Sequence, residues 1–232
     1  MKNKKWENFA NLTDKCYMNM IGAEEDAGCW RRAFELLMEI VREERQKDPN
    51  YAPQMEQLEE AMEYEYDLQG WLEDCLDEID MIGDFETLLH MCNDLLNIFK
   101  WPEYTGSDIK FRKAATLGNL GREKEAAAFC EKWIREEPEN IVAATAGAYA
   151  FIHIRDFEKA EQLIDRFIPD KSCCTDDNDI MFTAASLLYH VQGRKKEKKL
   201  VDKAIKEYEE YLEEYFESFE DEEYGDEELP FK

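Results

Sequence analysis

Hydrophobic positions along most of this chain recur at the three- and four-residue spacing of an amphipathic helix. The stretch "GREKEAAAFCEKWI" begins at Gly121 and places four such residues on one helical face: Ala126, Phe129, Cys130 and Trp133. β-Branched runs are few, and no pair of strands joined by a tight turn is indicated. The pattern therefore predicts an all-α fold.

The same pattern recurs along the chain. The stretch "RDFEKAEQLIDRFI" begins at Arg155, 34 residues after Gly121. It repeats the helical stripe with Ala160, Leu163, Ile164 and Phe167. Further copies begin at Gly83 and Gly193, each 38 residues from its neighbour, and a helical stripe precedes every copy. This periodicity predicts consecutive helix–turn–helix units.

We expect about five units. Their ranges are 5–48, 54–100, 108–138, 140–169 and 178–219, followed by an acidic, disordered tail over 220–232. The first unit has helices near 6–21 and 29–47. Residues 54–82 form either one long helix or two helices broken near Gly70. The final helix is expected to continue to about Phe219, and its aromatic residues cover either the last unit or a partner.

Small and large apolar residues alternate in a way that suits stacked helices. Alanines would let neighbouring helix axes approach closely, and aromatic residues would fill the gaps between layers. The alanines are Ala114, Ala126, Ala148 and Ala160, and the aromatic residues are Trp133, Phe151 and Phe167. Gly121 would permit a left-handed backbone after a helix, and Pro138 would end the second helix of its unit.

The stretch from about 108 to 169 resembles the tetratricopeptide repeat family. Second-helix positions of that family's pattern are filled by Ala126, Cys130, Pro138, Ala160 and Ile164. First helices depart from it, since Lys110 and Ala144 stand where the family often has tryptophan. The resemblance implies a right-handed superhelical solenoid whose first helices line a concave groove.

One phase of the first helices would then face that groove. The candidate groove-binding residues on this phase are Phe111, Ala115, Asn119, Thr145, Tyr149, His153, Thr183, Leu187 and His190, and Asp108 lies on the same phase. The alternative is that these residues pack between layers. No candidate is a lysine or arginine, so the carboxylate clamp of some family members is not expected.

Charge and composition narrow the classes of partner and compartment. The chain carries 55 acidic and 29 basic residues, for a formal charge of −26. This charge disfavours binding to nucleic acid or to anionic lipid and suits a basic partner. Apolar runs fall short of the roughly 20 residues that cross a bilayer, and the first residues lack the apolar middle of a signal peptide. We expect a cytoplasmic protein whose seven cysteines are reduced.

No motif for catalysis, a cofactor or a metal stands out. Phosphate-binding glycine loops, nucleophile elbows and HExxH are missing from the sequence. His90 and Cys92 would point to different helical faces, which argues against a shared metal. In "CCTDDND", Thr175 or Asp176 is expected to cap a helix. Cys173 and Cys174 are adjacent in this polar loop, beside acidic residues that oppose thiol ionisation.

The favoured hypothesis is a non-enzymatic module that binds a peptide or protein segment in the groove of a helical repeat array. An alternative is a ligand- or peptide-sensing regulatory domain that works with a separate DNA-binding partner. A hydrolase with a site among Asp74, Glu78 and His90 is a less favoured alternative, because acidic residues occur throughout the chain. The sequence does not indicate an oligomeric state.

Overall fold

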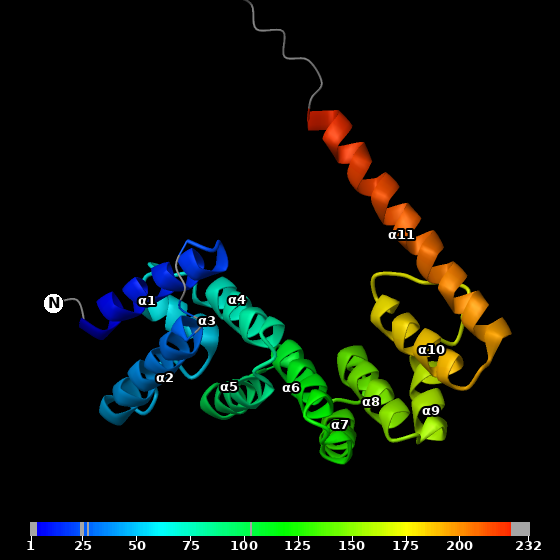
Figure 1. Cartoon of the computed structure of the whole chain (residues 1–232), viewed down its shortest axis with the longest axis horizontal. Coiled ribbons are helices and arrows are strands. Elements are labelled where there is room, and N and C mark those ends of the chain that lie inside the picture. The colour runs from blue at the N-terminus through cyan, green and yellow to red at the C-terminus, as the bar shows by residue number, and fades with distance from the viewer. Residues whose placement is uncertain (1–3, 24–25, 27, 103, 224–232) are drawn as a thin grey trace, which may run out of the picture. The chain divides into compact units, whose positions relative to one another are not determined.

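The computed structural model describes residues 4–23, 26, 28–102 and 104–223, with side chains described to residue 217. This part of the chain is built of helices and contains no strand, as the pattern predicted. The helices, labelled in Figure 1, are α1 (Lys4–Met20), α2 (Cys29–Lys47), α3 (Met55–Ala61), α4 (Leu68–Met81), α5 (Phe85–Ile98), α6 (Ser107–Asn119), α7 (Glu123–Glu136), α8 (Ile141–His153), α9 (Phe157–Phe167), α10 (Asp179–Val191) and α11 (Lys195–Glu223).

The chain divides into two compact units, Met1–Phe129 and Cys130–Lys232, whose boundary falls inside α7. In the first unit α1 packs on α2, α2 and α3 pack on α4, and α5 packs on both α4 and α6. Its core is large and apolar, and Trp30 and Trp71 stack within it at a ring-centroid distance of 6.3 Å. Cys16, Cys29 and Cys75 lie in the same core as small hydrophobic residues.

In the second unit α8 lies against both α9 and α10, and α10 packs in turn on α11. Nine of the 13 residues of α8 are buried, and His153 at its end is exposed. A Cβ on Gly147 would lie 2.5 Å from Cδ1 of Ile134 and 3.2 Å from Cδ1 of Leu163. Gly147 therefore allows the second half of α7 and helix α9 to approach α8 more closely than alanine would.

Each helical hairpin turns through a residue with left-handed backbone geometry. These residues are Gly22, Gly83, Gly121, Arg155 and Gly193, with φ angles of 73°, 75°, 71°, 64° and 71°. After Gly121, the amide of Arg122 donates to the carbonyl of Leu117 at 2.8 Å, and the Gly121 amide donates to that of Gly118 at 2.9 Å. The other four turns make the same pair of hydrogen bonds, which is the Schellman arrangement. The left-handed backbone predicted at Gly121 is confirmed.

Several predicted boundaries are confirmed and others need correction. Helix α2 has the expected range, and α7 ends just before Pro138 as predicted. The break between residues 54 and 82 lies over 62–67 and not at Gly70, because Glu63 and Tyr64 adopt positive φ. Gly70 instead belongs to the first turn of α4, where its amide donates to the side chain of the N-cap Asp67 at 2.9 Å.

Two further corrections concern the second unit. Neither Thr175 nor Asp176 caps α10, whose N-cap residue is Asn178. The Asn178 side chain accepts a hydrogen bond from the Thr175 amide at 2.9 Å, so it closes the preceding loop. Helix α11 continues past Phe219 to Glu223, and the rest of the predicted tail, 224–232, lies outside the described residues.

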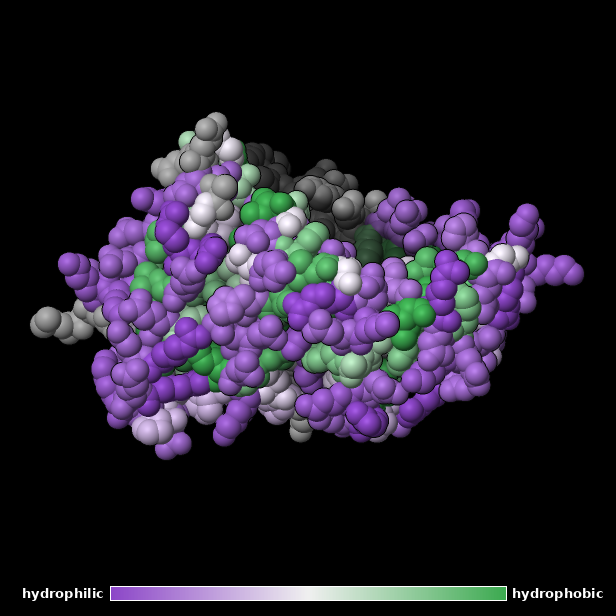
Figure 2. All heavy atoms as spheres, turned by 60° about the horizontal axis from the view of Figure 1, so that its bottom comes forward, coloured by the Kyte–Doolittle hydropathy of each residue, from purple (hydrophilic) through white to green (hydrophobic). Residues whose placement is uncertain are grey.

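Hydrophilic residues cover most of the face shown in Figure 2, with small hydrophobic areas between them. Within the described ranges, no helix combines the length and apolar character that a bilayer crossing requires.

Candidate functional site

A hollow of about 410 Å³ lies between α4 and α6, the first helices of two successive hairpins in the first unit. Its apolar lining comes from α3, α4, α6 and the loop before α6: Met55, Leu72, Leu76, Trp101 and Ile109. Three carboxylates line it as well, namely Glu73, Asp77 and Asp108. All three acidic residues are exposed, whereas Leu72, Leu76 and Ile109 are buried. The hollow therefore combines an apolar floor with an acidic rim.

Arg112 is the basic residue among those that line the hollow. Its guanidinium lies 2.5 Å from the Asp77 carboxylate and 3.7 Å from that of Asp80. These ion pairs join α6 to α4 and neutralise part of the rim. Among the described residues, Glu73 and Asp108 form no ion pair. The hollow therefore keeps a net negative charge.

Local sequence features position the walls of the hollow. Glu59 of α3 accepts hydrogen bonds from both the backbone amide and the side-chain amide of Gln69, at 2.8 and 2.7 Å, which joins α3 to α4. The indole nitrogen of Trp101 donates to the carbonyl of Leu95 at 3.1 Å. A Cβ on Gly106 would lie 2.9 Å from Trp101, so this glycine lets the indole pack against the start of α6.

The groove residues predicted on α6 lie beside this hollow and do not line it. Phe111 is half-buried, and Ala115 and Asn119 are exposed on the same helical face. The α6 residues that line the hollow are Asp108, Ile109 and Arg112. Of the residues on the predicted groove phase of α6, Asp108 lines the hollow. Sequence reasoning missed the contributions of α3 and Trp101, which depend on how the connecting loops fold.

The predicted groove residues of the second unit fall on two neighbouring helices. Tyr149 is half-buried and His153 exposed on α8, and burial raises the pKa of the Tyr149 hydroxyl. On α10, Leu187 is half-buried, and Thr183 and His190 are exposed. The two helices that carry these sets, α8 and α10, pack against each other.

Thr145 does not belong in the candidate set. Its side chain has no solvent exposure, and its hydroxyl lies 3.9 Å from the sulfur of Met181 on α10. The small Thr145 side chain packs where α8 and α10 approach each other, so a ligand on the surface cannot contact it.

A polar cluster joins α10 to α11 next to His190. The Ser186 hydroxyl donates to Asp202 at 2.5 Å, and the Lys198 ammonium lies 2.5 Å from the second carboxylate oxygen. Burial opposes ionisation of Asp202, but hydrogen bonds from Lys198 and Ser186 hold the pKa of Asp202 below its ordinary value. The Lys198 ammonium also donates to the Ser186 hydroxyl at 3.2 Å, so the three side chains hold α10 and α11 together.

The residues of the hydrolase alternative are dispersed. Asp74 accepts a hydrogen bond from the Tyr17 hydroxyl at 3.0 Å, and His90 lies 3.8 Å from Asp94. His90 lines a hollow of about 270 Å³ against α2, and neither Asp74 nor Glu78 lines it. The hollow lined by His90 therefore does not bring all three side chains together.

The cysteines divide into buried positions and positions in the predicted polar loop. Five are fully buried: Cys16, Cys29, Cys75, Cys92 and Cys130. Burial raises the pKa of Cys92 and of Cys130 to about 12, so these thiols are protonated at neutral pH. Across the described ranges, no three His, Cys, Asp or Glu side chains are grouped so that they could hold a metal ion.

Comparisons were made with protein-family models, with curated proteins and with solved structures, and none of the three found a match to this chain.

Proposed function

We propose that the protein is a non-enzymatic interaction module, built as a tetratricopeptide-like solenoid of helical hairpins, that binds a peptide or protein segment along its first helices. The hollow between α4 and α6 is the primary contact site. The observation that carries this proposal is that apolar and acidic side chains converge between two successive first helices.

Five turns support the repeat architecture, because each contains a residue in the left-handed backbone conformation and makes the same pair of hydrogen bonds. A repeated hairpin presents its first helices on one side, which is how helical repeat proteins build extended binding surfaces. The net charge of −26 adds long-range attraction for a basic segment. An apolar side chain would enter between Leu72 and Ile109, and a lysine or arginine beside it would meet Glu73 and Asp108.

The test is a peptide-display selection on the full chain, followed by fluorescence anisotropy with the selected peptide. In one variant, Glu73→Gln is combined with Asp108→Asn, which removes both unpaired carboxylates of the hollow while keeping the size of the side chains. We expect this variant to bind the peptide about tenfold more weakly, since both carboxylates are exposed and each exposed ion pair contributes about 0.2–1 kcal/mol.

A matched control combines Glu7→Gln with Asp14→Asn, two exposed positions of α1 that do not line the hollow. It loses the same charge, so it should bind as the unmodified protein does. Equal weakening of both variants would mean that binding follows net charge alone. A third variant, Tyr149→Ala with His153→Ala, reports whether the α8 surface contributes.

A further inference from the structure

Helix α11 is much longer than its hairpin partner α10, with 29 residues against 13. Figure 1 shows α11 running well past the end of α10. Among the described helices, α10 is the one that packs extensively on α11. The second half of α11 therefore extends beyond the helix that covers its first half.

The apolar face of α11 continues along this second half. Val201 and Ala204 are buried against the rest of the unit. Tyr208, Tyr211 and Tyr215 follow on the same face, each seven residues after an earlier member of the stripe. Tyr211 and Tyr215 stack on each other at 6.1 Å, yet they are 58% and 46% exposed, and neighbouring Phe216 is 63% exposed. Clustered exposed aromatic residues mark interaction surfaces.

The charge of α11 changes from basic to acidic where its exposed aromatic half begins. Residues 194–206 carry the basic side chains Arg194, Lys195, Lys196, Lys198, Lys199, Lys203 and Lys206. Residues 207–217 have no basic side chain and carry Glu207, Glu209, Glu210, Glu213, Glu214 and Glu217. The exposed aromatic residues thus lie within a purely acidic segment, and the basic half would repel a cationic partner toward it.

The acidic residues of this half lower the stability of the helix when no partner is bound. Glu209 and Glu213 are four residues apart, as are Glu210 and Glu214, and such like-charge pairs destabilise a helix. Negative charge also accumulates near the C-terminal end of the helix dipole, where positive charge is favoured. A cationic partner would relieve both effects.

A hollow of about 450 Å³ adjoins the beginning of this segment. It lies between α11 and the loop that joins α9 to α10, and its lining includes Cys174, Asp176, Asp177, Glu207, Tyr208 and Tyr211. No lysine or arginine lines it. The Tyr208 hydroxyl donates to the Asp176 carboxylate, which joins the loop to α11. Carboxylates beside tyrosine rings suit the side chain of a lysine or arginine.

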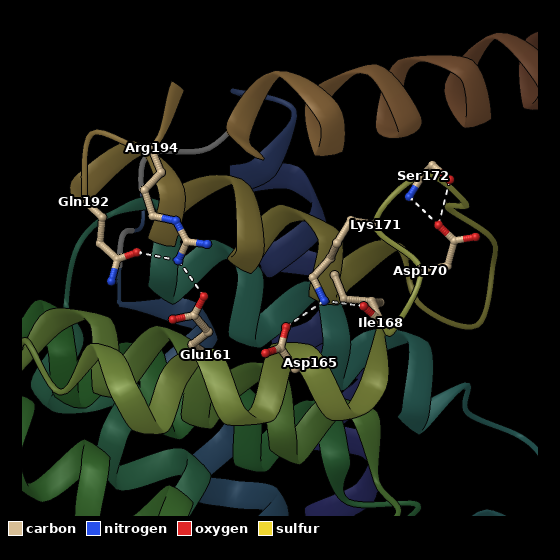
Figure 3. Close-up of polar contacts among 8 residues, drawn as sticks. All are labelled: Glu161, Asp165, Ile168, Asp170, Lys171, Ser172, Gln192 and Arg194. Atoms are coloured by element: carbon tan, nitrogen blue, oxygen red, sulfur yellow. Dashed lines mark hydrogen bonds and ion pairs between the residues drawn. The ribbon is translucent and has the colours of Figure 1, made fainter. Parts of the chain in front are cut away.

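Ion pairs join α9 to the start of this loop and to the residue before α11 (Figure 3). The Lys171 ammonium at the start of the loop lies 2.9 Å from Asp165 on α9 and donates to the carbonyl of Ile168. Arg194, just before α11, lies 2.5 Å from Glu161, one turn away from Asp165 on α9. Both the start of the loop and the start of α11 are therefore joined to α9.

We propose that residues 207–217 of α11, together with this hollow, form a docking surface for a basic amphipathic segment of another protein. The apolar side chains of that segment would pack on Tyr211 and Phe216, and its cationic side chains would meet the surrounding glutamates and Asp177. This surface is formed by other residues than those of the α4–α6 hollow, and the inference does not rest on that site.

The test uses a fluorescein-labelled synthetic peptide of about 18 residues, with leucine and lysine arranged as an amphipathic helix. A scrambled peptide of equal composition is the control for charge. Anisotropy is measured with the full chain at about 0.15 M salt, where exposed charges more than about 8 Å apart are screened. We expect the amphipathic peptide to bind about tenfold more tightly than the scrambled peptide, because only the former buries the aromatic face.

Variants then separate the docking surface from net charge. Combining Tyr211→Ala with Phe216→Ala leaves the charge unchanged and should weaken binding about tenfold. Leu200→Ala removes an exposed apolar side chain from the basic half of the same helix and should leave binding unchanged. Combining Tyr211→Phe with Phe216→Tyr changes the same two positions but keeps both rings, so this variant should retain binding. Retained binding would show that substitution at these positions does not itself unfold the helix. The Tyr211→Ala, Phe216→Ala change should weaken binding equally when it is made in the Glu73→Gln, Asp108→Asn protein, which separates this surface from peptide bound at the α4–α6 hollow.

Equal affinity for the two peptides, or no effect of the Tyr211→Ala, Phe216→Ala change, would overturn the inference. Sedimentation velocity on the protein alone provides a further check. Self-association that disappears in the Tyr211→Ala, Phe216→Ala variant would mean that a second copy of the chain occupies this surface, and this would also overturn it.

Discussion

Gly121 and Arg155 adopt the same left-handed backbone, with φ angles of 71° and 64°, at the same point of two helical hairpins. They are 34 residues apart, which is the repeat spacing of the sequence. After Gly121, the Arg122 amide donates to the carbonyl of Leu117 at 2.8 Å. After Arg155, the Asp156 amide donates to the carbonyl of Phe151 at the same distance. The turn geometry is thus conserved between hairpins although one position holds an arginine, whose Cβ makes this conformation strained.

Relief of this strain gives the first prediction. Arg155→Gly should stabilise the protein by about 0.5–1 kcal/mol, because glycine adopts positive φ without a steric penalty. Arg155→Ala removes the same side chain but keeps the strain, so it should not stabilise the protein. Urea unfolding followed by circular dichroism measures both changes. Equal stability of the two variants would show that the backbone at Arg155 is not strained.

A second prediction concerns the close approach at Gly147. Gly147→Ala should destabilise the protein by about 1–3 kcal/mol, because the added methyl group would overlap the Ile134 side chain. Ile134→Val removes the Cδ1 atom that lies 2.5 Å from the added carbon. In a double-mutant cycle it should therefore restore part of the loss. If the two effects simply add, the helices are not in contact at this point.

A third prediction compares two buried tryptophans. The Trp133 indole nitrogen donates to the Glu137 carboxylate at 2.8 Å, whereas the buried indole nitrogen of Trp30 has no hydrogen-bond partner among the described residues. Both indoles are 2% exposed, but only Trp133→Phe breaks a hydrogen bond to a charged group. Trp133→Phe should cost about 1–2 kcal/mol more than Trp30→Phe in chemical denaturation. The reverse order would contradict the hydrogen bond.

A fourth prediction is a pH dependence at Asp202. Because hydrogen bonds from Lys198 and Ser186 hold its pKa below the ordinary value in the folded state, Asp202 stabilises the fold above its unfolded pKa of about 3.9. This contribution is lost as the pH falls through the lower, folded-state pKa. Asp202→Asn should lower the melting temperature at neutral pH, and its melting temperature should fall less steeply on acidification. If the melting temperatures of the variant and the unmodified protein change equally with pH, Asp202 gains no stabilisation from these contacts.

Much of the fold could be predicted because helical periodicity is a local property. Ala126 and Ala160, which were expected to lie between closely packed helices, are both buried. The break at 62–67 was placed wrongly because Gly70 looks like an interruption, whereas Asp67 caps the helix in which it lies. A glycine can either interrupt a helix or lie in its first turn. Only the hydrogen bond that the Asp67 carboxylate accepts shows that Gly70 lies in a first turn.

The candidate site was less predictable, for a physical reason. The helical phase that carries Tyr149 and His153 identifies a face but not what covers it. Thr145 lies on the same phase and is buried, because α10 packs over that part of α8. Similarly, Trp101 reaches the α4–α6 hollow only because Gly106 leaves room for its ring. Such contacts depend on the packing of neighbouring elements, which periodicity does not report.

The measurement that most directly tests the proposed function is amide hydrogen exchange of the full chain, with and without a peptide selected for binding. The hollow is walled by α4 and α6, so the account predicts that bound peptide slows exchange in 68–81 and 107–119. Exchange in the Glu73→Gln, Asp108→Asn variant should change much less at the same peptide concentration. Protection that leaves both helices unchanged and appears elsewhere would contradict binding at the α4–α6 hollow.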